Sequence, residues 1–328
     1  MNQLPFLQNR NHRLRWGFAA LVALFAASLG GCAGQQTVIL ATHDSFAISD
    51  DLVSKFEQES GYELEVVRLG DTGSLVSRLA LTVSAPIADA YYGIDSSFLD
   101  RARDNMLIEG EPTEINFGDV CFNYDLAWFE AEGLQPPQHW DELASPQYAS
   151  LTVIADPRIS SPGKSFLLTT GEYFDNRVEL EAFWNDLYRN GVRLAASWED
   201  AYFLDFTRYG GDRPIVLSYA SSPAAELDEA GNARTAALRA DCFRQVEYAG
   251  VLPNAANRKG AEALVEFLRS DDFQAAVPEL MYVYPASETV QLDEKWRDAA
   301  PPATSFFTAG SAAEESELVI LWERVFGR

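Results

Sequence analysis

The amino-acid sequence predicts an α/β protein built from two successive sets of β-strands and helices. Short apolar runs that fit buried strands alternate with segments of helical spacing in the order β-α-β-α-β. This order is typical of a parallel sheet with covering helices. The alternation starts again near residue 151, and a chain of 328 residues is long enough for two such sets.

The first set is indicated by apolar periodicity. Leu52, Val53 and Phe56 share one face of an expected helix, and the TVILA string is a short run typical of a buried strand. The expected strands are 37–41, 63–69, 88–94 and 117–124, and the expected helices are 50–60 and 74–82, with another after the Pro136-Pro137 turn.

The second set follows the same rules. Leu180, Phe183, Trp184 and Leu187 lie on one face of an expected helix. The expected strands are 151–155, 192–196, 214–219 and 243–251. The expected helices are 178–190, 199–209, 261–268, 273–277 and 314–326, with helices also starting at 165–171 and 224–229.

The composition is that of an acidic globular protein. Hydrophobic residues make up 47% and charged residues 23% of the chain, which argues against a disordered chain. Asp and Glu number 49 against 25 Lys and Arg, so the formal net charge is −24. A surface this acidic repels phosphate backbones, and we therefore expect no nucleic-acid partner.

The N-terminus has the pattern of an export signal. Arg10, Arg13 and Arg15 precede an uncharged run at 16–29, which is too short to span a bilayer and has the size of a signal-peptide core. The string LGGC that ends at Cys32 resembles the lipobox of bacterial lipoproteins. We expect residues 1–31 to be a lipoprotein signal peptide and Cys32 to anchor the exported protein to a membrane face, in the periplasm or outside the plasma membrane. A plain signal peptide is the alternative.

Two further cysteines, Cys121 and Cys242, would meet oxidising conditions in an exported chain. They form a possible disulfide, and two buried free thiols are the alternative. The chain has only three histidines, at positions 12, 43 and 139, and no Cys-x-x-Cys pair. We therefore expect no Cys/His metal site.

Polar loops follow the expected strands of both sets. They lie at 42–45, 70–74, 95–97, 160–163, 197–198 and 219–223. Ligands of open α/β sheets bind beyond the carboxyl ends of the strands. Each loop taken alone is explained by helix capping, for which Ser and Asp are preferred. Six such loops in two sets indicate a ligand site.

Several strings in these loops resemble one known family. They are ATHDSF (41–46), RLGDTGSLVSRL (68–79), ADAYYGIDSSFLD (88–100), DPRISSPG (156–163), SWEDAY (197–202) and VLSYASSP (216–223). In this order they resemble the thiamine-binding proteins of bacterial ABC transporters. The resemblance implies a two-lobe periplasmic-binding-protein fold of type II, with a mostly parallel sheet and flanking helices in each lobe and the ligand cleft between them. It implies a first lobe of 36–117 plus 250–289 and a second of 118–249 plus 290–328.

The resemblance also implies a set of ligand-binding residues. They are Asp71, Thr72, Ser160, Ser161, Trp198, Tyr219, Ala220, Ser221, Ser222, Tyr282 and His43. Four features depart from the family pattern. His43 stands where Tyr is frequent, Tyr282 where Trp is usual, and Ala225 where Tyr is frequent. The Trp that can follow the DSF string is absent. The aromatic cage expected here is therefore thinner than is usual in the family.

The resemblance implies a transport function without catalysis. The protein would capture thiamine or its phosphates and deliver them to the permease of an ABC importer, as a monomer without a cofactor. The residue types suit such a ligand. Trp198, Tyr219 and Tyr282 can stack on the pyrimidine and face the thiazolium cation, at about 0.5–2 kcal/mol for each cation–π contact. Asp71 can pair with the cation or the amine, and Ser160 and Ser161 open a helix that suits a hydroxyl or phosphate.

Two other functions fit a chain of this kind. One is a receptor of the same fold for a polyamine or for ferric iron. The other is a thiamine-degrading transferase, which needs a Cys nucleophile and an acidic base. Only Cys121 could serve as that nucleophile, and a disulfide with Cys242 would remove it. Among ligands, thiamine, its phosphate esters and a pyrimidine precursor all stay open.

Overall fold

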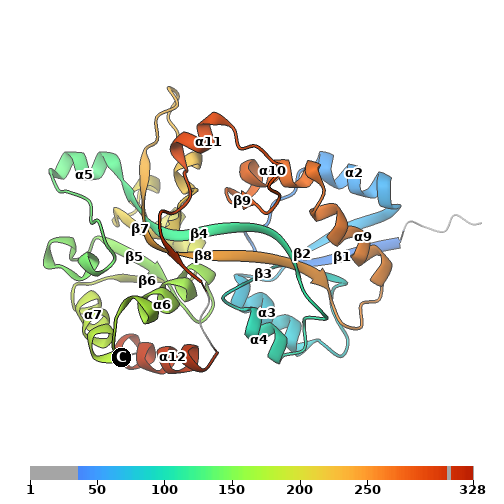
Figure 1. Ribbon diagram of the computed structural model, residues 1–328, viewed down its shortest axis with the longest axis horizontal. Helices are drawn as coiled ribbons and strands as arrows, with labels where there is room; N and C mark the ends of the chain where they lie inside the picture. The colour runs from blue at the N-terminus through green and yellow to red at the C-terminus, as the bar shows by residue number, and fades with distance from the viewer. Residues whose placement is uncertain (1–35, 309–311, 328) are drawn as a thin grey trace, which may run out of the picture. The chain divides into compact units, whose positions relative to one another are not determined.

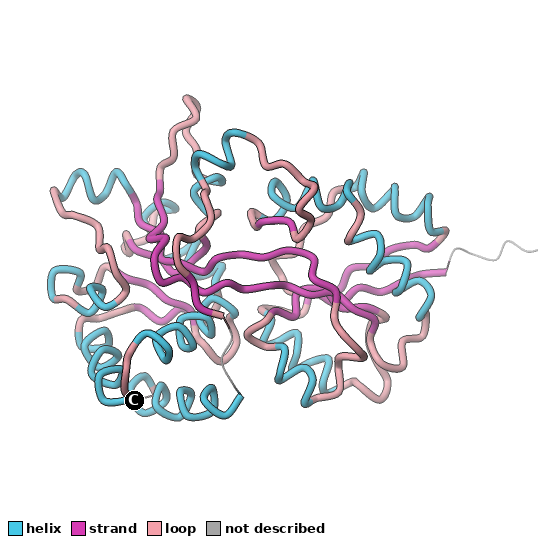
Figure 2. Tube along the Cα trace, in the orientation of Figure 1, coloured by secondary structure: helices cyan, strands magenta, loops and turns pink. Residues whose placement is uncertain are grey.

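One mixed β-sheet runs through the protein (Figures 1 and 2). The computed structural model describes residues 36–308 and 312–327. The strands follow the order β2-β1-β3-β8-β4-β7-β5-β6, with β9 paired to β4 and β10 paired to β8. The predicted signal peptide and the predicted lipidation site at Cys32 lie outside the described residues. Within those ranges, no helix has the length and apolar character needed to cross a membrane.

The first end of the sheet is close to the sequence prediction. It contains β1 (Gln36–Thr42), β2 (Tyr62–Arg68) and β3 (Ala90–Asp95), with α2 (Asp50–Ser60), α3 (Thr72–Leu81) and α4 (Leu99–Asp104). β1 and β3 are parallel, with Leu40 opposite Ala90. Ser49 caps α2 by accepting the Leu52 N–H, and Gly61 ends it in the left-handed region at φ 76°. The short helix α4 was not predicted.

The second end is also a parallel arrangement. β5 (Thr152–Ala155) pairs in parallel with both β6 (Arg193–Ala195) and β7 (Ile215–Tyr219). The helices of this end are α5 (Leu126–Glu132), α6 (Ser161–Tyr173), α7 (Arg177–Arg189) and α12 (Ala312–Phe326). Asn176 caps α7 by accepting two backbone N–H groups, which explains its start within one residue of the prediction.

Two long antiparallel strands, β4 (Thr113–Asp125) and β8 (Thr235–Val251), join the two ends (Figure 1). β3 pairs with β8, and β4 with β7, also in antiparallel fashion. The predicted two-lobe α/β fold is confirmed, and antiparallel pairings at the centre join the mostly parallel strands of the two lobes into one sheet. The predicted strands were too short because polar residues interrupt the apolar runs. In the fold these residues are paired, as in the two bonds of 2.7 and 2.9 Å from Arg244 to Asp119.

Two predicted helices are broken into short turns. The segment expected as a helix at 199–209 consists of α8 (Trp198–Asp200), a π-helical turn η3 (Ala201–Asp205) and a 3₁₀ turn η4 (Thr207–Tyr209). The segment at 224–229 is only the 3₁₀ turn η5 (Ser222–Ala225). The remaining elements are η1 (Asp141–Ala144), η2 (Pro146–Tyr148), α9 (Arg258–Leu268), α10 (Asp271–Met281), β9 (Tyr284–Pro285), α11 (Glu294–Ala299) and β10 (Phe306–Phe307).

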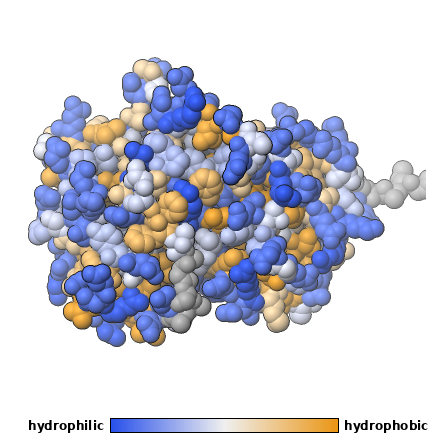
Figure 3. All heavy atoms as spheres, in the orientation of Figure 1, coloured by the Kyte–Doolittle hydropathy of each residue, from blue (hydrophilic) through white to orange (hydrophobic). Residues whose placement is uncertain are grey.

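The buried apolar residues form two main groups, which we call the first and the second lobe. The first lobe is built on β1–β3 with α2, α3, α4, α9 and α10, and the second on β5–β7 with α6, α7 and α12. From Thr37 onward, the described chain is one compact unit. Hydrophilic side chains cover most of the face drawn in Figure 3, with apolar residues in smaller groups between them. The lobe boundaries expected from the sequence stay a prediction.

A disulfide joins Cys121 of β4 to Cys242 of β8, with the two Cα atoms 4.8 Å apart. It lies where the register of the two strands shifts, between the pairs Val120–Phe243 and Phe122–Leu238. Such a bulge leaves residues of one strand unpaired. The covalent bond therefore fastens the two central strands where their hydrogen-bonded ladder is interrupted.

Candidate functional site

A cavity lies at the junction of the two lobes. Together with the open space at its mouth it takes in about 670 Å³. Its walls come from strand ends and loops of both lobes and from the middle of β8. The lining residues are His43, Ser45, Asp71, Thr72, Ser161, Pro162, Trp198, Tyr219, Ser222, Gln245, Glu247, Met281, Tyr282 and Val283.

Most of the residues expected to bind a ligand are brought together here. Eight of them line the cavity: His43, Asp71, Thr72, Ser161, Trp198, Tyr219, Ser222 and Tyr282. Three others, Ser160, Ala220 and Ser221, are buried behind the wall and are not among the lining residues. Ala220 packs beside Cys121 and Cys242 instead.

Asp71 presents a partly buried carboxylate to the cavity from the start of α3. It is the N-cap residue of that helix, although its side chain makes no capping hydrogen bond. Burial raises the pKa of Asp71 to about 6, the backbone N–H of Trp198 opposes the rise, and the charge of Glu199 adds to it. That N–H lies 3.4 Å from Oδ2. A carboxylate that ionises at such a cost favours a cationic ligand.

Trp198 is fixed in the wall by the second lobe. Its indole Nε1 donates to Ser218 Oγ at 3.0 Å, and its ring stacks on Tyr202 at 5.2 Å and 26°. Tyr202 in turn donates to the buried Glu226 at 3.0 Å. Tyr219 lies 6.1 Å from Trp198 at 64°, so the two rings form an aromatic corner of the cavity.

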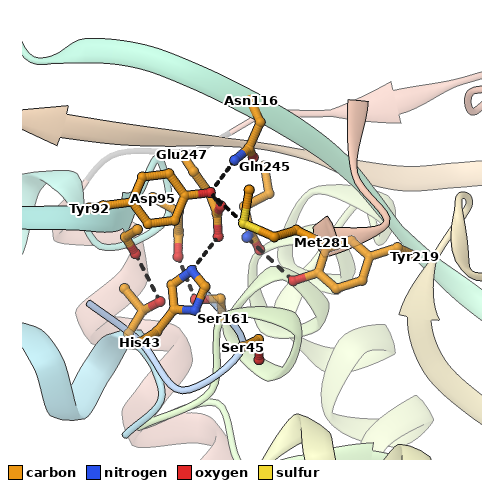
Figure 4. A network of polar contacts seen from close by, with 12 residues as sticks. His43, Ser45, Tyr92, Asp95, Asn116, Ser161, Tyr219, Gln245, Glu247 and Met281 are labelled. Carbon is orange, nitrogen blue, oxygen red and sulfur yellow. Dashed lines mark hydrogen bonds and ion pairs between the residues drawn. The ribbon is translucent and has the colours of Figure 1, made fainter. Parts of the chain in front are cut away.

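An ion pair forms part of the cavity wall (Figure 4). His43 Nε2 and Glu247 Oε1 are 3.1 Å apart, and the Tyr92 hydroxyl donates to Glu247 at 2.8 Å. Burial alone would lower the pKa of His43, but Glu247 more than offsets this and raises it. Burial would likewise raise the pKa of Glu247, but the charge of His43 and the hydrogen bonds from His43, Tyr92 and Asn116 together lower it. Each side chain of this pair therefore favours the charged form of the other.

Glu247 and Gln245 were not indicated by the sequence. Both lie in the middle of β8, whereas sequence reasoning searched the loops at strand ends. Gln245 Nε2 donates to the Tyr219 hydroxyl at 3.4 Å (Figure 4). The alternation of side chains along a half-buried strand is the one signal that could have pointed to them, since QVE places both on the same face. Ser45, Pro162, Met281 and Val283, also unpredicted, are neighbours of predicted residues or motifs.

The start of α6 already faces a carboxylate. The Ser161 hydroxyl donates to Asp95 Oδ2, across the junction of the lobes. Asp95 also accepts the Ser97 N–H at 2.7 Å and the Ser97 hydroxyl. Burial raises the pKa of Asp95, opposed by these hydrogen bonds. The hydrogen of the Ser161 hydroxyl is thus committed to Asp95, and toward a ligand this oxygen acts as an acceptor.

The lobes also touch through their backbones beside the cavity. The Gly73 N–H donates to the Ile159 carbonyl at 3.0 Å. A Cβ atom at Gly73 would lie 2.8 Å from two backbone atoms of Ile159, closer than real Cβ atoms approach. A glycine is therefore required for this contact.

The chemistry of the cavity suits a flat cation. Asp71 has no basic residue among its lining neighbours apart from His43, which is paired with Glu247. The aromatic rings of Trp198, Tyr219 and Tyr282 can attract a positive ligand through their faces. Within the ranges 36–308 and 312–327, no group of three His, Cys, Asp or Glu side chains could hold a metal ion.

Comparisons with known proteins agree with this reading. A thiamine-binding periplasmic protein of Salmonella typhimurium is 29% identical over 309 residues, covering 88% of this chain and 92% of that protein. One from Brucella suis is 27% identical over 274 residues, covering 78% and 80%. Together they confirm the resemblance that the loop motifs indicated.

Solved structures confirm the α/β periplasmic-binding fold. A periplasmic thiamin binding protein has a TM-score of 0.78 and 25% identity, covering 91% of this chain and 98% of its own. Iron-bound HitA from Pseudomonas aeruginosa has a TM-score of 0.68 at 17% identity, covering 89% and 99%, and this likeness concerns the fold alone. The family model described as bacterial extracellular solute-binding protein matches residues 87–310, and the chain therefore belongs to that family.

Proposed function

We propose that the protein binds thiamine or a thiamine phosphate in this cavity and delivers it to the permease of a bacterial ABC importer. The main support is the position of Asp71. Its carboxylate has a raised pKa and lies in a cavity with aromatic walls, where no Lys or Arg side chain is among the lining residues. The thiazolium of thiamine would supply a positive charge there. The names of the relatives from Salmonella typhimurium and Brucella suis support the same ligand.

The proposal does not include catalysis. A thiamine-degrading transferase of this fold would need a cysteine nucleophile, and Cys121 was the one candidate. Cys121 is fully buried and bonded to Cys242, and neither residue lines the cavity. A receptor that binds and releases its ligand unchanged fits these positions better.

Titration calorimetry tests the proposed ligand. Purified mature protein is titrated with thiamine, its monophosphate and its diphosphate, with spermidine and ferric citrate as comparators. Binding of a thiamine form with neither comparator supports the proposal. Bound ligand should also protect against heat, by about 2.7 kcal/mol at 100 times the dissociation constant. Binding of spermidine or iron alone would point to one of the other receptors of this fold.

We also propose that the exported protein carries a lipid anchor at Cys32. The three arginines, the uncharged run and the LGGC string support this assignment. Mass spectrometry of the native protein is expected to find a mature chain that starts at a lipidated Cys32. A mature chain that starts at another residue, without lipid, would contradict the anchor and leave export intact.

Trp198→Ala is expected to weaken binding of thiamine and of its phosphates alike, because the ring would contact the part that all three share. Loss of a buried ring face should lower the affinity about 10- to 100-fold, equal to about 1.4–2.7 kcal/mol. Calorimetry measures this, with Trp128→Ala as a matched control. Trp128 is a half-buried tryptophan of the second lobe that does not line the cavity. Equal affinities for both variants would remove Trp198 from the site.

A further inference from the structure

Helix α11 lies between two parts of the cavity wall. A small core cluster contains Trp296 and Ala300, at and just after this helix, together with Ala224 and Tyr284. Ala224 belongs to the turn η5, which begins with the cavity residue Ser222. Tyr284 follows the cavity residues Tyr282 and Val283. The cluster therefore joins a wall segment of the second lobe to one beside α10.

Trp296 is the centre of this cluster. It is 1% exposed, and its ring stacks on Tyr282 at 6.4 Å and 15° and meets the edge of Tyr284 at 5.8 Å and 78°. The helix is held at both ends. Asp293 caps it by accepting the Trp296 N–H at 2.8 Å, and the Tyr284 hydroxyl donates to the Ala300 carbonyl at 2.8 Å. The indole ring therefore has little freedom to move.

Tyr282 depends on such support. It ends α10 in the left-handed region at φ 53°, a conformation that a residue other than glycine adopts at a cost. The residue lines the cavity and is 39% exposed, so the surrounding core does not enclose it. An aromatic ring of the cavity wall that is already ordered in the ligand-free protein raises affinity, because binding then loses less conformational entropy.

We propose that Trp296 is a positioning residue for the ligand site. Its ring holds Tyr282 at the cavity and, through Ala224, keeps η5 at a fixed separation from Tyr282. Trp296 does not itself line the cavity. Its effect on affinity rests on the proposed function, whereas its effect on the order of the two wall segments does not.

The test compares two substitutions, Trp296→Leu and Trp296→Phe. The indole Nε1 is buried without a hydrogen-bond partner among the described residues, so phenylalanine loses no such bond and keeps a stacking ring. Trp140→Leu is the matched control. Trp140 is also 1% exposed with an unpartnered Nε1 in that part of the chain, but it lies in the core of the second lobe.

Hydrogen exchange of the ligand-free protein is the first readout. We expect Trp296→Leu to speed amide exchange in both 281–283 and 222–225, and Trp296→Phe and Trp140→Leu to leave these segments unchanged. Calorimetry is the second readout. Thiamine affinity should fall at least about tenfold in Trp296→Leu and stay within about threefold in the other two variants.

The outcomes separate this inference from the proposed function. Unchanged exchange in both wall segments of folded Trp296→Leu would overturn the positioning role, as would an equal loss of affinity in Trp140→Leu. Wild-type protein that binds no thiamine form would overturn the proposed function alone. The exchange pattern would then still decide whether Trp296 orders the two segments.

Discussion

Asp71→Asn is expected to stabilise the ligand-free protein while it weakens binding of a cation. Burial raises the pKa of Asp71 from 3.8 to about 6, so at pH 7.5 the folded protein holds an ionised carboxylate at a cost of about 3 kcal/mol. The neutral amide avoids most of this cost. Thermal denaturation without ligand should therefore show a higher Tm for the variant.

The same substitution removes the charge that would face the thiazolium. Removing one partner of a buried charge pair typically costs about 2–5 kcal/mol, so thiamine affinity should fall at least about 30-fold. Asp104→Asn, an exposed change in α4 of the same lobe, controls for net charge and should affect neither quantity. A variant at Asp71 that binds thiamine as tightly as the wild type would remove this residue from the site.

The pH dependence follows from the same raised pKa. Above pH 6 the ionised Asp71 lowers the free energy of unfolding by the whole of this cost. The cost disappears as the pH falls toward 3.8, where the carboxyl is protonated in both the folded and the unfolded protein. Cation affinity changes in the opposite direction. It should be at its maximum above pH 6 and fall by up to about tenfold per pH unit below it, as protons compete with the ligand. Asp71→Asn should lose this dependence.

Removal of the disulfide is expected to cost more stability than any other change considered. Cys121 and Cys242 are separated by 121 positions, and release of such a loop lowers the free energy of unfolding by about 4–5 kcal/mol in the chain-entropy model. The double variant Cys121→Ala/Cys242→Ala tests this by denaturation, with no reductant present. Neither side chain lines the cavity, so thiamine affinity should change little at a temperature where the variant is folded.

Reductant supplies the control for this result. It should lower the Tm of the wild type toward that of the double variant and leave the double variant itself unchanged. Equal Tm values for the oxidised wild type and the variant would contradict a stabilising role for the bond.

The strands at the two ends of the sheet were predictable because their apolar residues form short runs or alternate with polar ones. β3 is buried at every position, and its predicted bounds of 88–94 overlap all but the last residue of Ala90–Asp95. The central strands β4 and β8 were predicted, but too short, at 117–124 and 243–251. β4 and β8 contain buried polar residues such as Asp119, whose partner Arg244 comes from the other strand. Such long-range pairing cannot be read from local periodicity.

In the candidate site, too, some residues could be predicted from the sequence and others could not. Asp71, Ser161 and Trp198 could be predicted because strand-end loops converge in an α/β fold, and family motifs mark the same loops. Glu247 could not, because a lone acid in a β-strand normally lies on the solvent face. Only the sheet order, with β8 beside β3, brings it to Tyr92 and His43.

The contact between Gly73 and Ile159 brings the main chains of the two lobes together. Backbone meets backbone there, and backbone cannot move aside as a side chain can. The contact therefore sets the distance between the lobes at this point through main-chain atoms. A side chain at position 73 would push the two backbones apart, so the spacing of the lobes beside the cavity depends on this glycine.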